Sequence, residues 1–137
     1  MKFPFRYYNH ECEKEMLSCF AVIPGAPHNL RVIEAKARSV VINFTPGSSG
    51  RAPILSYTIE YNNESSDDSA TARWRVLMVV QDAHLVWDLL PLTLPHLKPY
   101  TDYRFRVTAA NKVGRSSPSN ASDTIKTLEA GELTEKS

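Results

Sequence analysis

The chain has 137 residues, with 16 basic and 15 acidic side chains and a net charge of +1. This length favours one domain that buries a core without help from metals or disulfides. The near-neutral charge argues against binding driven by bulk charge to nucleic acid or anionic lipid. No run approaches the roughly 20 apolar residues that cross a bilayer, so we expect no direct membrane insertion.

The sequence divides into three parts. Residues 1–23 show no clean hydrophobic period and carry interrupting charges, which predicts an irregular N-terminal extension or a remnant rather than a signal peptide. Residues 24–128 have the pattern of one all-β unit, and residues 129–137 are polar, as in a linker or a disordered tail. Without a signal peptide, the chain is either intracellular or a fragment whose beginning lies upstream.

Within residues 24–128, apolar and polar side chains alternate with the period of a β-strand. The positions predicted to face the core are Val40, Ile42, Phe44, Tyr57, Ile59, Tyr61, Trp74, Val76, Tyr103, Phe105, Val107 and Ala109. The positions predicted to face outward include Asn43, Thr58, Glu60, Asn62, Arg104, Arg106 and Thr108. We expect two shorter strands at residues 91–94 and 123–128. Several short strands separated by turn signals predict a β-sandwich of about seven strands in two sheets.

The segment 77–91 is long and apolar for a connection between strands. It either holds one strand with an inserted excursion, or forms a helical turn around residues 83–90, and the pattern does not decide between them.

The run LKPYTDY predicts a tyrosine corner, in which a phenol near the start of a strand bonds back to upstream backbone. Leu97 is expected to fill the core, Pro99 to fix the turn beside Thr101, and Tyr103 to bond backward. A buried phenol needs such a partner. The motif is therefore predicted to be structural and not catalytic.

At these residues the chain resembles a family. The order PGAPHNLRV, SVVINFTP, APILSYTIEY, a Trp, LKPYTDYRFRVTAANKVGRSSPS and DTIKT resembles a fibronectin type III domain over residues 24–128, with Phe44 where the usual Trp stands. RAPILSYTIEYN and FRVTAANKVGRSSPSNAS resemble the repeats of neuroglian- and neurofascin-type neural adhesion receptors. The resemblance implies an extracellular, non-enzymatic module, repeated in tandem between immunoglobulin domains and a membrane anchor.

Three N-x-Ser/Thr sequons begin at Asn43, Asn63 and Asn120. Each Asn is predicted on an outward strand position or in a polar turn, where a glycan would not enter the core. In secreted material we expect these three residues to be glycosylated. Chance sequons in a cytosolic domain are the alternative.

Four arginines, Arg73, Arg75, Arg104 and Arg106, are predicted to flank Glu60 on one sheet face. Such a basic surface would bind a protein or a sulfated glycan by bidentate contacts. The alternative is an ordinary solvated face with cross-strand Arg–Glu pairs.

The loop Lys112-Val113-Gly114-Arg115 stands where other fibronectin domains carry an integrin-binding Arg-Gly-Asp tripeptide, which is absent here. Gly114 is instead expected to supply a positive φ in a turn.

No zinc spacing joins His10, Cys12, Cys19 and His28, and no nucleophile elbow or phosphate loop accompanies His84, His96, Asp82 and Asp88. We therefore predict no metal, no cofactor and no enzymatic activity. Cys12 and Cys19 form a local disulfide, stay free or belong to a remnant.

The predicted function is an adhesion and recognition module of a cell-surface receptor. It would contact other proteins of cells or matrix, homophilically or heterophilically, beside neighbouring immunoglobulin or fibronectin domains. A structural module of a sarcomeric or cytoskeletal filament is the main alternative. A cytokine-receptor domain is disfavoured, because RSSPSNAS replaces its W-S-x-W-S box.

Overall fold

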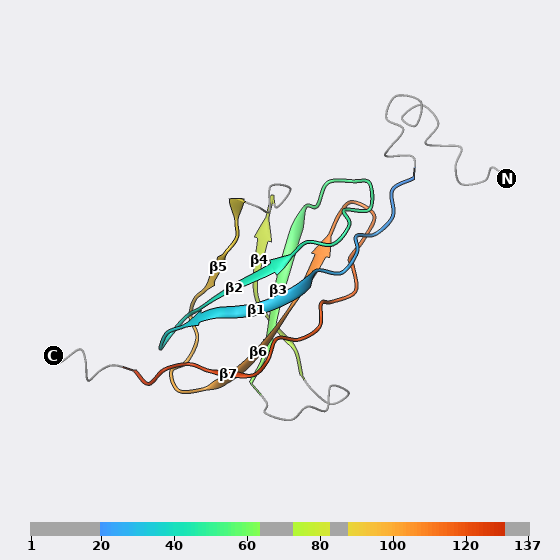
Figure 1. The fold of residues 1–137 in the computed structure, drawn as a ribbon. Helices are drawn as coiled ribbons and strands as arrows, with labels where there is room; N and C mark the ends of the chain where they lie inside the picture. Colours follow the sequence, from blue (N-terminus) through green and yellow to red (C-terminus); the bar gives the residue numbers. More distant parts are fainter. Residues whose placement is uncertain (1–19, 64–72, 83–87, 131–137) are drawn as a thin grey trace.

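The computed structural model describes residues 20–63, 73–82 and 88–130. These residues form the strands β1 (His28–Ala35), β2 (Val40–Thr45), β3 (Ser56–Asn62), β4 (Arg75–Gln81), β5 (Leu92–Leu94), β6 (Asp102–Ala110) and β7 (Ile125–Lys126). One sheet has the order β1-β2-β5 and the other has the order β4-β3-β6-β7, with antiparallel pairing throughout (Figure 1). The predicted all-β sandwich is confirmed.

The core lies between the two sheets and consists of the side chains that alternate inward along β2, β3 and β6. Buried apolar residues are Val40, Ile42, Phe44, Tyr57, Ile59, Tyr103, Phe105, Val107 and Ala109, joined by Leu94 and Leu97. The Phe44 ring on β2 lies 5.2 Å from the Tyr57 ring on β3, which joins the two sheets. Tyr61 is half-buried against this cluster, with its ring 5.7 Å from that of Tyr103.

A β-bulge reverses the alternation along β4. Ile59 pairs with Met78, whereas the next residue of β3, Glu60, pairs with Val76, so Leu77 is the extra residue. Beyond the bulge Met78 packs against the core, while Val76 before it is 57% exposed. The predicted inward positions of Val76 and Trp74 are therefore wrong. A bulge inserts one residue into a strand and moves every side chain before it to the opposite face.

Asn62 and Thr108 differ from the prediction in another way. Both were expected to face water, yet they are 2% and 4% exposed. Asn62 pairs with Arg104, and Thr108 pairs with Thr58. Both residues lie on the two middle strands of the four-stranded sheet, β3 and β6, where neighbours on each side remove them from solvent.

The described chain enters the sandwich at one end and leaves it at the opposite end (Figure 1). The loops between β2 and β3 and between β6 and β7 lie at the entry end. The segment expected as strand 123–128 pairs with β6 only at Ile125 and Lys126. Of the open segment 77–91, residues 77–81 belong to β4 and residues 83–87, which include most of the possible helical turn, lie outside the described residues.

Candidate functional site

The outer face of the sheet formed by β4, β3 and β6 is a grid of cross-strand rows. Glu60 lies between Val76 and Arg106, Thr58 lies between Val79 and Thr108, and Ser56 lies between Gln81 and Ala110. Directly opposed residues share a face of the sheet. Trp74, two residues before Val76, continues the β4 column beside Arg104.

Two arginines pack on one indole at the end of this grid. The guanidinium carbon of Arg106 lies 4.5 Å from the centre of the Trp74 ring, and that of Arg104 lies 5.7 Å from it. Arg106 Nε also donates to Glu60 Oε1 at 2.7 Å. A guanidinium over an indole face is attracted by the ring quadrupole, and the short charge-assisted bond to Glu60 fixes its orientation. Trp74 is therefore a platform for the arginines and not a core residue.

The predicted surface of four arginines around Glu60 is not what the structure shows. Arg104 and Arg106 share the face with Glu60, but Arg75 is paired with Tyr61, whose ring packs on the inner side. Arg73 precedes β4 and is exposed. The bulge at Leu77 is again the cause, because it exchanged the faces on which Trp74 and Arg75 were expected.

The charge of this face is largely satisfied within the protein. The side chains of Arg106 and Glu60 are only 28% and 14% exposed, and their ion pair holds the guanidinium toward the sheet. Val76 and Val79 on the same face are 57% and 43% exposed. A half-buried ion pair with exposed valines and an aromatic anchor suits contact with another protein. It suits a sulfated glycan less well, because that ligand needs free cations.

The tyrosine corner residues meet as a cluster. The backbone N–H of Lys98 donates to the Tyr103 hydroxyl oxygen at 2.9 Å, and Tyr103 is buried. The Thr101 hydroxyl donates to the Pro99 carbonyl at 2.8 Å, and Leu97 packs in the core. These contacts tie the β5–β6 connection to the start of β6.

A ladder of hydroxyl groups along β6 had no counterpart in the sequence analysis. Ser116, Ser119 and Ser122 are buried, and each backbone N–H donates to a β6 carbonyl at 2.8 Å: those of Ala109, Val107 and Phe105 in turn. Each serine Oγ accepts from the N–H of the same β6 residue at 3.0 Å. Thr127 repeats the pattern with Thr101. The signal that could have revealed it is the three-residue spacing of S-x-x-S-x-x-S, which matches the three residues per turn of a polyproline II helix.

The three predicted glycosylation residues differ in how much of each is exposed to solvent. Asn63 and Asn120 are exposed, and the rest of the Asn63 sequon lies outside the described residues. Asn43 is partly buried on the outer side of β2, where its Oδ1 accepts from Phe44 N at 3.1 Å. Ser122, the hydroxyl residue of the Asn120 sequon, is 4% exposed.

Gly114, in the β6–β7 loop, does not have the positive φ that was expected of it. Among the described residues the positive φ of a glycine belongs to Gly50, at +77°. Gly114 is instead close to Ile23, whose Cγ2 would be 3.2 Å from an added Cβ. The expectation for Gly114 is therefore wrong: its small size, and not a left-handed backbone, suits the position.

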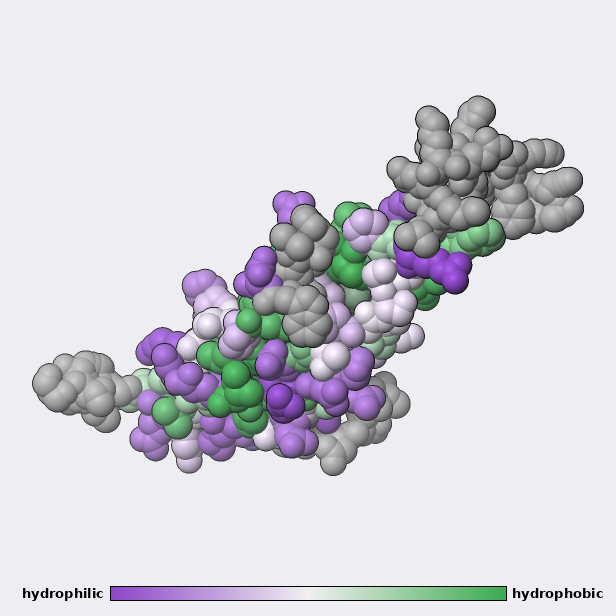
Figure 2. All heavy atoms as spheres, turned by 45° about the horizontal axis from the view of Figure 1, so that its top comes forward, coloured by the Kyte–Doolittle hydropathy of each residue, from purple (hydrophilic) through white to green (hydrophobic). Residues whose placement is uncertain are grey.

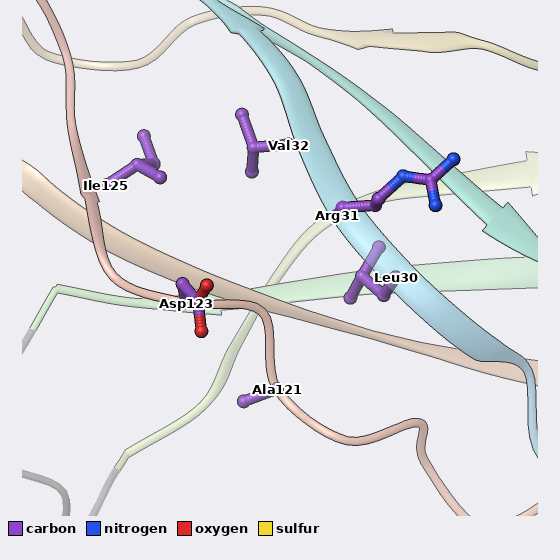
Figure 3. A pocket seen from close by; sticks show the side chains of 6 residues that line it. All are labelled: Leu30, Arg31, Val32, Ala121, Asp123 and Ile125. Atoms are coloured by element: carbon purple, nitrogen blue, oxygen red, sulfur yellow. The ribbon is translucent and has the colours of Figure 1, made fainter.

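A hollow of about 170 Å³ opens where β1 faces the chain before β7 (Figure 3). Leu30, Val32 and Ile125 point into a shared space with Asp123 at its edge, while the Arg31 guanidinium turns away. Small-molecule sites usually occupy roughly 300–1,000 Å³. This hollow has room for one side chain, and a single carboxylate at its edge does not make an acid–base pair.

The residues considered for metal binding or catalysis are not brought together. In the described part of the chain, no three His, Cys, Asp or Glu side chains form a group that could hold a metal ion. His28, His96, Asp82 and Asp88 are exposed. His10, Cys12, Cys19 and His84 lie outside the described residues. Nor do the described residues form a helix with the length and apolarity that a membrane crossing requires.

Comparison with known proteins assigns the sandwich. The profile of the fibronectin type III domain matches residues 25–125. The chain belongs to the fibronectin type III family. It is 39% identical over 104 residues to neural cell adhesion molecule L1 of Takifugu rubripes, and 34% identical over 109 residues to protein sidekick of Drosophila melanogaster. The alignments cover 76% and 80% of this chain but 7% and 4% of the two relatives. This fibronectin type III chain thus spans less than a tenth of their length.

A solved structure of domains A168–A170 from titin is also similar to this fibronectin type III domain. Its TM-score is 0.64 at 28% sequence identity, and the match covers 80% of this chain and 34% of that one. This fibronectin type III domain is therefore similar both to parts of cell adhesion molecules and to a part of titin.

Proposed function

We propose that this fibronectin type III module is an extracellular adhesion and recognition unit of a cell-surface receptor without enzymatic activity of its own. The observation that supports it is the 39% identity to neural cell adhesion molecule L1, which extends over 104 residues. In this proposal residues 24–128 form the module, residues 1–23 are an N-terminal extension and residues 129–137 are a linker.

The mechanism is geometric. Since the chain enters and leaves at opposite ends of a packed sandwich, each module adds a fixed length between its neighbours, which would be immunoglobulin or fibronectin domains (Figure 1). The outer face around Trp74, Val76 and Val79 contacts other proteins on cells or in the matrix, in a homophilic or a heterophilic pair. Its exposed valines and its Trp–Arg anchor give it the composition of a protein interface.

Glycans at Asn43, Asn63 and Asn120 complete the proposal. Asn63 and Asn120 are exposed and Asn43 lies on the outer side of β2, so none of the three points into the core. The Ser122 hydroxyl of the third sequon accepts from Phe105 N and donates to the Asp123 carbonyl. The proposal therefore requires glycan transfer to Asn120 before this segment pairs with β6.

A module of an intracellular filament is the second candidate, favoured by the similarity to titin domains at 28% identity. The two candidates differ in cellular location and in glycosylation. The filament candidate predicts no access from the cell exterior.

The test is surface labelling of intact cells that express the full natural chain, with a biotin reagent that does not cross membranes, followed by N-glycosidase treatment. We expect labelled protein whose electrophoretic mobility increases after the enzyme. Asn43→Gln, Asn63→Gln and Asn120→Gln should each remove one step of the mobility shift, whereas Asn29→Gln, outside any sequon, should remove none. Labelling only after permeabilisation, with no shift, would establish the filament candidate instead.

A further inference from the structure

Three chain segments meet at the entry end of the sandwich, and one buried side chain joins them. Asn111 is 6% exposed. Its Nδ2 donates to the carbonyls of Val22 and Ser49, both at 2.8 Å, and its Oδ1 accepts from Val113 N at 2.8 Å and Gly114 N at 3.2 Å. The amide thus uses both donors and its acceptor to hold the N-terminal segment, the β2–β3 loop and the β6–β7 loop.

The same segments approach backbone to backbone. Val22 N donates to the Gly50 carbonyl at 2.9 Å, and Gly25 N donates to the Ser48 carbonyl at 2.8 Å. A Cβ on Gly50 would collide with the Val22 carbonyl, and one on Gly47 would lie 2.6 Å from the Ala26 carbonyl. These hydrogen bonds and close approaches hold Val22 and Gly25 against the β2–β3 loop, ahead of any partner.

The surface that this arrangement displays is apolar with a cationic rim. Phe20, Val22, Ile23 and Val113 are between 47% and 59% exposed, and Arg51, Lys112 and Arg115 are exposed around them. Arg51 Cζ lies 5.9 Å from the centre of the Phe20 ring. Residues 20–27, 46–55 and 111–118 contain no Asp or Glu. Figure 2 shows hydrophobic groups beside a strongly hydrophilic one where the described chain begins. We use the name end patch for the seven exposed residues Phe20, Val22, Ile23, Arg51, Lys112, Val113 and Arg115.

We propose that the end patch docks against the module that precedes this one in the longer chain, and that the contacting surface of that module is acidic around an apolar centre. The inference rests on the proposed function only in taking the protein to be one module of a multi-module chain. An exposed apolar patch rimmed by charges marks an interaction surface. A preorganised surface loses little entropy on binding.

Two observations select a preceding module as the occupant. The end patch surrounds the point where the chain enters the sandwich, so whatever precedes it is held nearby at high effective concentration. The similar proteins are much longer than one module: this chain covers 34% of a structure that comprises domains A168–A170 of titin, and 7% of neural cell adhesion molecule L1. A second copy of the end patch is a poor occupant, because Arg51, Lys112 and Arg115 would face identical cations.

Hydrogen exchange of the full natural chain tests the docking. We expect the amides of Val22, Ile23 and Gly25 and of residues 111–114 to exchange about tenfold more slowly in the full chain than in the 137-residue chain, because docking adds to the local opening free energy. The double variant Val22→Ser with Val113→Ser should abolish the slower exchange of the full chain relative to the 137-residue chain. Arg51→Glu should reduce this difference in exchange rate. Ile33→Ser, which changes a residue of β1 that is also 50% exposed, should leave it unchanged.

Equal exchange in the full chain and the 137-residue chain overturns the docking. So does slow exchange that survives both the double variant and Arg51→Glu, and so does protection that appears only when a separate protein is added. Thermal unfolding of each variant shows whether the sandwich is intact. Surface labelling and the glycosidase shift do not depend on the end patch, so failure of the docking is distinguishable from failure of the proposed function.

Discussion

Ser119 pairs with Val107 through both its backbone and its side chain. The Ser119 N–H donates to the Val107 carbonyl at 2.8 Å, and the Ser119 hydroxyl oxygen accepts from the Val107 N–H at 3.0 Å. In a regular ladder a backbone carbonyl would accept this hydrogen bond, and here the serine hydroxyl replaces it. The segment 116–122 can therefore run beside β6 with one pair of hydrogen bonds at every third residue.

Ser119→Ala removes the acceptor of a buried backbone donor. We expect the free energy of unfolding to fall by about 1–3 kcal/mol, because the Val107 N–H then has no partner in a site that excludes water. Urea denaturation measures the change. Ser117→Ala, an exposed neighbour, should stay within about 0.5 kcal/mol of the parent. Equal effects of the two substitutions would contradict the ladder.

Tyr103→Phe keeps the packed ring and deletes the hydroxyl that accepts from Lys98 N. The expected loss is about 1–2 kcal/mol of unfolding free energy, because the Lys98 N–H loses its acceptor at the crossover between sheets. Tyr100→Phe is the matched control, since Tyr100 is 61% exposed. Thermal denaturation of both variants gives the comparison. A Tyr103→Phe protein as stable as the control would show that the corner does not pin the fold.

Trp74 and Arg106 should be energetically coupled. A double-mutant cycle with Trp74→Ala and Arg106→Ala is expected to give a coupling energy of about 0.5–2 kcal/mol, because the ring face attracts the guanidinium 4.5 Å from its centre. The cycle Trp74→Ala with Arg115→Ala should give none, because Arg115 lies in the β6–β7 loop. Additive effects of Trp74→Ala and Arg106→Ala would exclude the stacking as a stabilising contact.

The buried phenol of Tyr57 should make the free energy of unfolding fall at alkaline pH. Burial raises the pKa of the Tyr57 phenol above the ordinary tyrosine value of 10.0. Since the folded state disfavours the phenolate, the contribution of Tyr57 is fully present below the unfolded pKa and is lost as the pH rises through the folded pKa. Tyr57→Phe should flatten the fall of stability above about pH 10. Urea titrations from pH 8 to the alkaline limit of folding measure the slope, and an unchanged slope in the variant would assign the fall to other groups.

Val76→Glu with Val79→Glu tests the outer face of β4 as the contact surface. We expect cells that express the full natural chain with this change to adhere at least several-fold less, because charge on an interface core disfavours its burial. Both valines are exposed, so the melting temperature should move little. Ile33→Glu on β1 is the control for added charge. Unchanged adhesion of the double variant would move the contact to another face.

The alternation of apolar residues predicted the two sheets and most of the core because each inward side chain of β2 and β6 lies in an unbroken strand. The prediction failed on β4. One extra residue, Leu77, reverses the faces of Trp74 and Val76, and nothing in RWRVLMVV distinguishes a bulged strand from a regular one. A bulge is decided by pairing with β3, which is a tertiary contact.

The hydroxyl ladder and the role of Asn111 escaped prediction for a related reason. Serine and asparagine in a polar run are typical of a loop, and their burial depends on a partner strand that is distant in sequence. Ser122, for example, bonds Phe105 across 17 residues, and Asn111 bonds Val22 across 89. By contrast, the tyrosine corner could be anticipated because its bond joins residues only five apart.

The serine ladder along β6 also affects whether two copies of the protein can pair edge to edge. An ordinary edge strand offers a neighbour a continuous row of free amides and carbonyls, from which cross-β aggregates grow. Here the border of β6 is occupied by a segment in register with it only at every third residue, interrupted by Pro118, and its free side does not match a strand repeat. Copies of the protein that meet along this border would therefore find no continuous row of free amides and carbonyls to pair with.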